Sequence, residues 1–486
     1  MLKKIQDIFV RTVNAVENKP VPFVRYYLLF AAILAVRLAL EFFSSRRLFT
    51  LDDILHIGLW FIFIVLAFLL LLHLFSGEKI MKVAKLVIVF FSIALTAPII
   101  DLVITGGTGA KMNYLSLHSW KNVAWSYLTL GGSSLSRGAT PGIRIEIALL
   151  VIASFNYVRI KRNSITIGLL AAVSIYTVLF ISGAVPNLLG LIVSAFHLQY
   201  QHDDQSTVLL LLTLDIFLLM IALFRHSPKG GYAIIKTVPW VAFIIVLLHA
   251  AIGIALALKN YPGNWQITPT TFFWFPLLFM LSLCFAALAG LHNAADKKNK
   301  GPQPVKITNG LLLIILVISS MIGAKIFFTA LLIWAILFLL HDPVLELKRI
   351  PVLRNLLHSV IFLTAAFVGF CTFGAPMIGF PATWLFVLLT SAFFGGMFSE
   401  LGLKNSGVFR DSVKAATLNK IICIVLLAAG FVYTDVWLLN QSPFRLIFLL
   451  AVVPPVLMLW FKPTKTQYIL LSLVPAYTLL LLSTYN

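Results

Sequence analysis

The chain has 486 residues, of which 60% are hydrophobic and only 11% are charged. A soluble protein of this length carries roughly 25% charged residues, so the composition excludes a string of soluble domains and indicates a polytopic membrane protein. The formal net charge of +20 would suggest nucleic-acid binding in a soluble protein. In a membrane protein, an excess of Lys and Arg is typical of the loops on the inner face.

Continuous apolar runs recur along the chain, and each is long enough for a helix to cross the roughly 30 Å hydrocarbon layer of a bilayer. None alternates apolar and polar residues as a half-buried strand does, so the predicted fold class is all-α. The polar stretch 225–236 divides the runs into a six-helix block, residues 1–231, and a nine-helix block, residues 232–486. The fifteen predicted membrane helices begin near residues 26, 55, 85, 143, 164, 206, 238, 272, 308, 326, 357, 383, 420, 444 and 466.

The distribution of Lys and Arg predicts the orientation of these helices. If the N-terminus lies inside, the inner loops hold about three times as many Lys and Arg residues as the outer loops. One missed helix would invert this bias in every later loop. We therefore expect an integral protein of a bacterial inner membrane with its N-terminus inside and its C-terminus outside. Because topology accounts for the positive charge, we expect no nucleic-acid partner.

Ionisable residues inside the predicted helices are costly unless they have partners, so each is a candidate site. Arg37 and Glu41 are four residues apart and can form an ion pair on one helix face. Arg144 and Glu146 are two apart, so each is expected to contact another helix. Asp215 stands alone in LLLLTLDIFLLM. It is interpreted either as a proton or cation relay or as a neutral carboxylic acid with a hydrogen-bond partner in the first block.

Two outer segments of the first block have two interpretations each. His202, Asp203 and Asp204 precede the sixth predicted helix, where Asp is an ordinary capping residue, although carboxylates can also bind Mg²⁺ or a substrate. The loop 106–142 is rich in Gly, Ser and aromatic residues. Its aromatic side chains are expected either at the level of the lipid headgroups or in a lid over a binding site.

The predicted inner loops of the second block combine carboxylates with clustered cations. Such a combination suits a diphosphate, because carboxylates bind Mg²⁺, the metal bridges phosphate oxygens, and Lys and Arg neutralise the remaining charge. The alternative is that these are ordinary cationic inner loops with incidental acids. The candidate metal-binding and catalytic residues are Asp296, Glu400 and Asp411, and the candidate diphosphate-binding residues are Lys297, Lys300, Lys348 and Arg349.

The order of these loops resembles the UbiA superfamily of intramembrane prenyltransferases. That family has nine helices, with Asp-rich motifs after the second and sixth helices and a basic segment after the fourth. The segment LKRIPVLRN, residues 347–355, is similar to the basic segment, and DKKNKGPQP, residues 296–304, resembles the end of the first Asp-rich motif. Of the first motif's carboxylates, only the last is matched, by Asp296. The resemblance covers about half of the chain, residues 232–486.

The resemblance implies a membrane enzyme that transfers an isoprenoid chain from a prenyl diphosphate to an apolar or aromatic acceptor held in the membrane. It implies Mg²⁺ as the cofactor and the residues above as its ligands and diphosphate contacts. Because several carboxylates of the family are missing, the alternative is a non-catalytic relative that serves as a scaffold, or as a subunit for transport or assembly.

Overall fold

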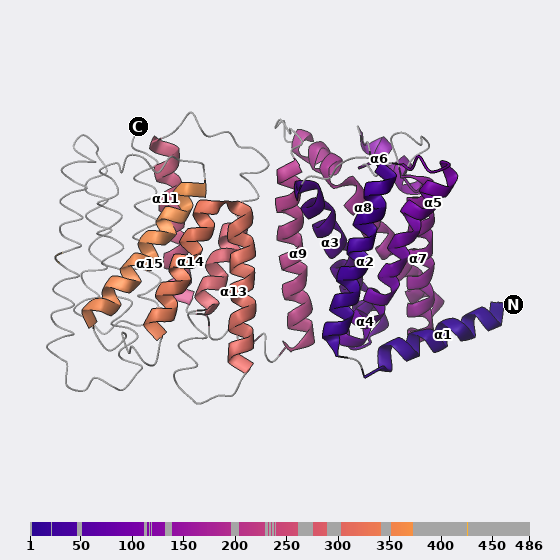
Figure 1. Cartoon of the computed structure of the whole chain (residues 1–486), viewed down its shortest axis with the longest axis horizontal. Coiled ribbons are helices and arrows are strands. Elements are labelled where there is room, and N and C mark those ends of the chain that lie inside the picture. The colour runs from indigo at the N-terminus through magenta and orange to yellow at the C-terminus, as the bar shows by residue number, and fades with distance from the viewer. Residues whose placement is uncertain are drawn as a thin grey trace. The chain divides into compact units, whose positions relative to one another are not determined.

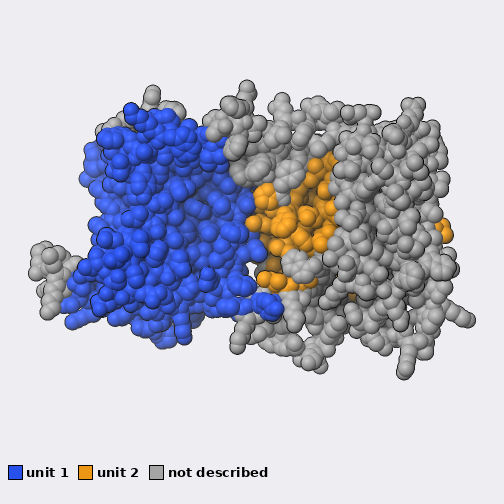
Figure 2. Space-filling model, turned by 180° about the vertical axis from the view of Figure 1, so that it is seen from behind, with its two compact units in different colours: residues 1–232, 268–273 blue, residues 233–267, 274–486 orange. Residues whose placement is uncertain are grey.

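The structure is a computed structural model, and the chain forms two compact units, residues 1–232 with 268–273 and residues 233–267 with 274–486 (Figure 2). The described residues contain helices and no strand, so the fold class is all-α, as predicted. They are residues 2–20, 22–45, 51–110, 114–115, 117, 119–131, 139–195, 204–228, 232, 235, 238, 240–260, 276–288, 303–341, 351–372 and 425.

The helices of unit 1 include long rods, several shorter helices and a 3₁₀ turn, η1, that joins α4 to α5 (Figure 1). Their bounds are α1 Leu2–Asn18, α2 Phe23–Ser45, α3 Leu51–Ser76, α4 Ile80–Phe90, η1 Phe91–Leu95, α5 Thr96–Ile104, α6 Trp120–Leu128, α7 Pro141–Arg162, α8 Ile165–Ala195 and α9 Asp204–His226.

Unit 2 has five longer helices among its described residues. Their bounds are α11 Trp240–Asn260, an unlabelled helix Pro276–Leu288, α13 Gln303–Ile322, α14 Ala324–His341 and α15 Pro351–Thr372.

Each of the first eleven predicted membrane segments coincides with one of these helices or with the rod formed by α4, η1 and α5. The four segments that begin near residues 383, 420, 444 and 466 lie outside the described residues, apart from Val425. Among the described helices, five stretches are long and apolar enough to cross a membrane: Val24–Phe43, Asp53–Ser76, Ile80–Ile104, Ile165–Ile192 and Thr207–His226. The chain is therefore a membrane-embedded helical protein.

Two short helices lie at opposite ends of the unit 1 bundle (Figure 1). Helix α1 runs across one end, where its Val13 side chain is buried and its Glu17 carboxylate accepts hydrogen bonds from Tyr157 (2.9 Å) and Lys161 (2.5 Å). Lys161 also pairs with Glu78 at 3.4 Å. Burial raises the pKa of the Glu78 carboxyl, but Lys161 and Lys82 more than offset this, so its pKa lies below the ordinary value.

Helix α6 lies at the other end and divides its aromatic residues between two environments. Trp120 and Trp125 are exposed, whereas Tyr127 packs against Tyr176 and Phe180 of α8 at centroid distances of 4.7 and 5.1 Å. Exposed tryptophans at the end of a membrane bundle are typical of the headgroup layer. This part of the loop therefore fits the interfacial interpretation.

Side-chain packing between α3, α4, α7 and α8 forms the main core of unit 1. In a bilayer, lipid tails are as apolar as the side chains, so close packing rather than the hydrophobic effect holds helices together. The buried members include Leu72, Val83, Leu86, Tyr157, Val158, Ala171 and Ile175.

Helices α11 and α15 of unit 2 approach each other through small residues. A Cβ atom added at Gly253 would lie 1.8 Å from the carbonyl oxygen of Ala366, and one added at Gly369 would lie 1.9 Å from that of Ala250. Each helix thus presents a small-residue pair at i and i+3, and the pairs bring the two backbones together.

Candidate functional site

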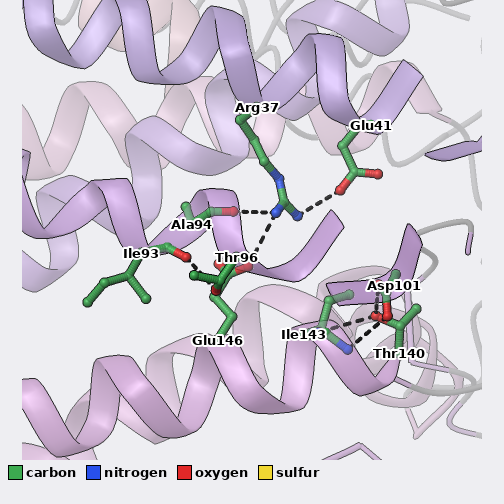
Figure 3. Close-up of polar contacts among 10 residues, drawn as sticks. Arg37, Glu41, Ile93, Ala94, Thr96, Asp101, Thr140, Ile143 and Glu146 are labelled. Carbon is green, nitrogen blue, oxygen red and sulfur yellow. Dashed lines mark hydrogen bonds and ion pairs between the residues drawn. The ribbon is translucent and has the colours of Figure 1, made fainter. Parts of the chain in front are cut away.

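Arg37 of α2 is the centre of a buried charged cluster in unit 1 (Figure 3). Its side chain is 1% exposed, and its Nη2 atom lies 2.7 Å from Glu41 Oε1, one helical turn further along α2. Its Nη1 atom lies 3.4 Å from Glu146 Oε2 of α7 and also donates a hydrogen bond to the carbonyl oxygen of Ala94. The guanidinium sits over the ring of Phe61, 5.4 Å from its centroid. The predicted pair of Arg37 with Glu41 is confirmed, as is the contact of Glu146 with another helix.

The acceptor at Ala94 is a consequence of Pro98, four residues later. A proline inside a helix has no N–H, and its ring clashes with the carbonyl of residue i−4, so that carbonyl loses its helical partner. The freed group here is the Ala94 carbonyl, which lies in η1 between α4 and α5. Arg37 donates to this oxygen, so the proline gives the buried guanidinium an acceptor on a neighbouring helix.

Asp101 fixes the start of α7 beside the same cluster. Its carboxylate accepts hydrogen bonds from the Thr140 hydroxyl (2.5 Å) and from the Gly142 N–H (2.8 Å). Thr140 is the N-cap of α7 and accepts from the Ile143 N–H at 3.2 Å. A negative charge is stabilised at a helix N-terminus by the unpaired N–H groups and the helix dipole. Asp101 therefore acts as an anionic cap that holds α5 to α7.

Glu146 also lines a partly open pocket that is otherwise almost entirely apolar. The pocket lies between α3, α4, η1, α7 and α8, and its cavity volume of about 30 Å³ is far below the ~300–1,000 Å³ range of ligand sites. Ser154, two turns beyond Glu146 on α7, is the other polar residue of the lining. The remaining lining residues are Phe61, Ile64, Val65, Phe68, Leu72, Val87, Phe90, Phe91, Ala94, Leu150, Ala153 and Leu179.

The polar groups of this cluster differ in how many hydrogen-bond or ion-pair partners they have. Glu41 has the short contact with Arg37, and Asp101 has two donors of its own. Glu146 has only the 3.4 Å contact, and no described residue donates to its Oε1 atom. The Nε–H of Arg37 is buried and has no hydrogen-bond partner among the described residues. The site therefore holds one buried donor without a partner among the described residues, the Arg37 Nε–H, and one carboxylate, that of Glu146, in the wall of an apolar pocket.

Asp215 of α9 is buried at 5% exposure, which confirms that it does not face lipid. Neither carboxylate oxygen has a hydrogen-bond partner among the described residues, so the partner expected in the first block is not found there and stays a prediction. The apolar residues around it on α9 offer no donor, and a buried carboxylate without a donor is unfavourable as an anion. The arrangement therefore favours the neutral acid over the ion.

The residues predicted to bind metal and diphosphate lie outside the described residues. These are Asp296, Lys297, Lys300, Lys348, Arg349, Glu400 and Asp411, together with His202 and Asp203. Asp204 is the first residue of α9, which agrees with a capping position for this tract, but its side chain is not described. No group of three or more His, Cys, Asp or Glu residues that could hold a metal occurs within the described ranges.

The pairing of Arg37 with Glu146 and the cap that Asp101 forms at α7 were not predicted, because each joins segments far apart in the chain. A signal for part of it was present in the sequence. Pro98 inside an apolar segment implies a free carbonyl at Ala94, and an arginine buried in another helix is a natural donor for it.

Comparison of the chain with family models, with curated proteins and with solved structures finds no match in any of the three.

Proposed function

We propose that the chain is an intramembrane prenyltransferase of the inner membrane of a bacterium. It would bind an isoprenoid diphosphate at the inner ends of the helices of unit 2 and transfer the isoprenoid chain to an apolar or aromatic acceptor. The order of the polar loops in the sequence supports this proposal, as does the helical, membrane-embedded character of the chain.

The structural observation that carries the proposal is the hairpin of α13 and α14. The two helices pack together and are joined through the single residue Gly323, which adopts a φ of +156°. Because their lengths, 20 and 18 residues, are similar, Gln303 and His341 fall at the same end of the hairpin (Figure 1). Asp296 precedes α13 in the sequence and Lys348 follows α14, which supports the proposal that the two residues act at the same end of the hairpin.

In this proposal, carboxylates bind the metal and cationic side chains bind the diphosphate at that end of the hairpin. Asp296, Glu400 and Asp411 supply the oxygen donors that suit Mg²⁺, and the bound metal would neutralise charge on the diphosphate. Lys297, Lys300, Lys348 and Arg349 would contact the remaining phosphate oxygens and stabilise the departing diphosphate. The apolar helices around the site would exclude water from the isoprenoid chain.

The purified full chain in lipid nanodiscs, supplied with farnesyl diphosphate, Mg²⁺ and a lipid extract, tests the proposal. We expect release of diphosphate together with formation of an apolar labelled product. Asp296→Asn and Lys348→Gln should each lower the rate by at least tenfold, because each removes a charge that faces the diphosphate. Glu78→Gln, in the turn between α3 and α4 of unit 1, is the control and should leave the rate unchanged.

A cross-linking experiment tests the site without requiring activity. In a variant whose native cysteines are replaced by serine, Asp296→Cys and Lys348→Cys should form a cross-link with a short bifunctional maleimide. Binding of farnesyl diphosphate should slow this reaction. Absence of both diphosphate binding and the cross-link would overturn the enzyme assignment and leave the alternative of a non-catalytic scaffold or a transport or assembly subunit.

A further inference from the structure

The buried cluster around Arg37 contains more carboxylates than cations (Figure 3). Glu41 and Glu146 both contact the Arg37 guanidinium, and Asp101 adds a further negative charge that acts on both glutamates. A buried charge is unfavourable unless it is paired and hydrogen-bonded. Because Arg37 can neutralise only one carboxylate, the other two must be stabilised in another way.

The three carboxylates differ in the stabilisation that each receives as an anion. Asp101 accepts two hydrogen bonds at the start of α7, where the helix dipole favours a negative charge. Glu41 Oε1 lies 2.7 Å from the Arg37 guanidinium. Glu146 is only 8% exposed, and its contact with Arg37 is longer, at 3.4 Å. Glu146 is therefore the carboxylate that gains most from binding a proton.

The pocket that Glu146 lines gives such a proton a place to exchange. Its lining residues on α3, α4 and α8 are all uncharged, so no cation on these helices compensates the carboxylate. On α7 itself, Arg144 directs its Nε–H group to the Ala139 carbonyl oxygen at 3.1 Å. The cavity volume of about 30 Å³ exceeds the roughly 10–15 Å³ that one water molecule needs. A water molecule therefore fits in the pocket, where it can give a proton to Glu146 and take it back.

We propose that Glu146 is a proton-binding site within the helical bundle of unit 1 and that it exchanges its proton with water in the pocket. Proton uptake at Oε1 converts the carboxylate to a neutral carboxylic acid, while Oε2 stays beside Arg37 and Arg37 stays paired with Glu41. The inference does not depend on the proposed transferase activity, because every residue involved lies in unit 1. It gives unit 1 a protonatable carboxyl of the kind that forms proton relays in membrane proteins.

Infrared spectroscopy of the full chain in nanodiscs at pH 7 tests the proposal. A protonated carboxyl has a carbonyl-stretch band that a carboxylate lacks. We expect such a band in the unaltered chain and its loss in Glu146→Gln, and in D₂O the band should move to lower frequency as deuterium replaces the proton. Glu78→Gln is the control, because Glu78 is partly exposed and paired with Lys82 and Lys161, and it should leave the band unchanged. Identical spectra for Glu146→Gln and the unaltered chain would overturn the site.

Glu41→Gln provides a readout that a purely structural role of Glu146 would not change. This variant removes the competing negative charge, so Arg37 becomes available to stabilise Glu146 as an anion. The band assigned to Glu146 should therefore weaken at pH 7. A band of unchanged strength in a folded Glu41→Gln variant would contradict the competition of the two glutamates for Arg37.

Isotope labelling decides the proposal if the Glu146 variant does not fold. Incorporation of glutamate labelled with ¹³C at the side-chain carboxyl should move the band of the unaltered chain to lower frequency. A band from a protonated aspartic acid, such as Asp215, would not move. Absence of any band that responds to labelled glutamate would exclude a protonated Glu146.

Discussion

At the scale of single residues, Arg37 controls the stability of unit 1 because it is the cation that contacts both Glu41 and Glu146. Removing one partner of a buried ion pair leaves an uncompensated charge and costs roughly 3–5 kcal/mol. An exposed pair contributes only about 0–1 kcal/mol, because water and salt screen it. The effect of a charged side chain on the free energy of unfolding therefore depends on whether the side chain is buried, rather than on the number of ion pairs.

We expect Arg37→Met to lower the free energy of unfolding by roughly 3–5 kcal/mol. Lys82→Met is a matched control, because Lys82 also belongs to an i,i+4 pair, with Glu78 at 3.5 Å, but its side chain is 36% exposed. The control should cost about 1 kcal/mol or less. Unfolding of both variants in detergent, followed by circular dichroism, gives the comparison, and equal losses would contradict the buried role of Arg37. Adding Glu41→Gln and Glu146→Gln to Arg37→Met should restore part of the stability.

Unlike Arg37, Asp215 should be replaceable with little loss of stability, because its carboxylate lacks a partner among the described residues. Asp215→Leu leaves no donor stranded and replaces a poorly solvated polar group by an apolar one, so it should be neutral or stabilising. Asp215→Asn should also fold. Thermal unfolding of both variants checks this. A destabilisation of about 2 kcal/mol or more by leucine would point to a partner after all, and loss of function in a folded asparagine variant would favour a proton or cation role.

At the scale of helices, prolines inside apolar segments free carbonyls that side chains of other helices then use. Pro98 frees the Ala94 carbonyl for Arg37. Pro186 lies inside α8, and the carbonyl four residues earlier, that of Ser182, accepts a hydrogen bond from the Trp60 indole of α3 at 3.1 Å. In a membrane, such re-pairing is what makes proline tolerable inside a helix.

The Trp60 contact predicts that a substitution of Pro186 in α8 reduces the loss of stability caused by a substitution of Trp60 in α3. Trp60→Phe removes the indole donor and leaves the Ser182 carbonyl without a partner, which should cost about 1–3 kcal/mol. In a Pro186→Ala background, residue 186 can donate to that carbonyl within α8, so Trp60→Phe should cost less than half as much. A double-mutant cycle of unfolding free energies measures this coupling. Equal costs in both backgrounds would show that the proline does not create the acceptor.

The crossing of α11 and α15 gives the second prediction at this scale. Gly253→Ala would place a methyl group 1.8 Å from the Ala366 carbonyl oxygen, so the helices must separate. Gly58→Ala in α3 is the control, because nothing lies within 4 Å of its added Cβ, and alanine gains up to about 1 kcal/mol of helix propensity. We expect a lower melting temperature for the first variant and an unchanged or higher one for the second. A lower melting temperature for Gly58→Ala than for Gly253→Ala would exclude the close contact between α11 and α15.

The membrane class, the all-α fold and the helices at the first eleven predicted segments follow from the length and apolarity of those segments. The Arg37–Glu41 pair follows from helical spacing, since it lies within one segment. The contacts of Glu146 and the cap formed by Asp101 do not follow, because they depend on which helices are neighbours. Asp215 shows the same limit, because its burial was predictable from the cost of lipid exposure, whereas its lack of a partner among the described residues depends on the side chains of other helices.

At the scale of the whole molecule, the charge of the loops predicts how the chain crosses the membrane. Residues 297–306 contain four lysines and should lie inside, whereas the loop that contains Gly263 should lie outside, because α11 and the helix Pro276–Leu288 flank it. Reporter fusions at Lys300 and Gly263 should therefore respond from opposite faces, and a fusion after Asn486 should report the outer face. As a control, a fusion at Lys79, between α3 and α4, should agree with the one at Lys300. If the reporters at Lys300 and Gly263 respond from the same face, the proposed position of Asp296 and Lys348 on the inner face is wrong. If the reporter after Asn486 responds from inside, the chain does not cross the membrane an odd number of times.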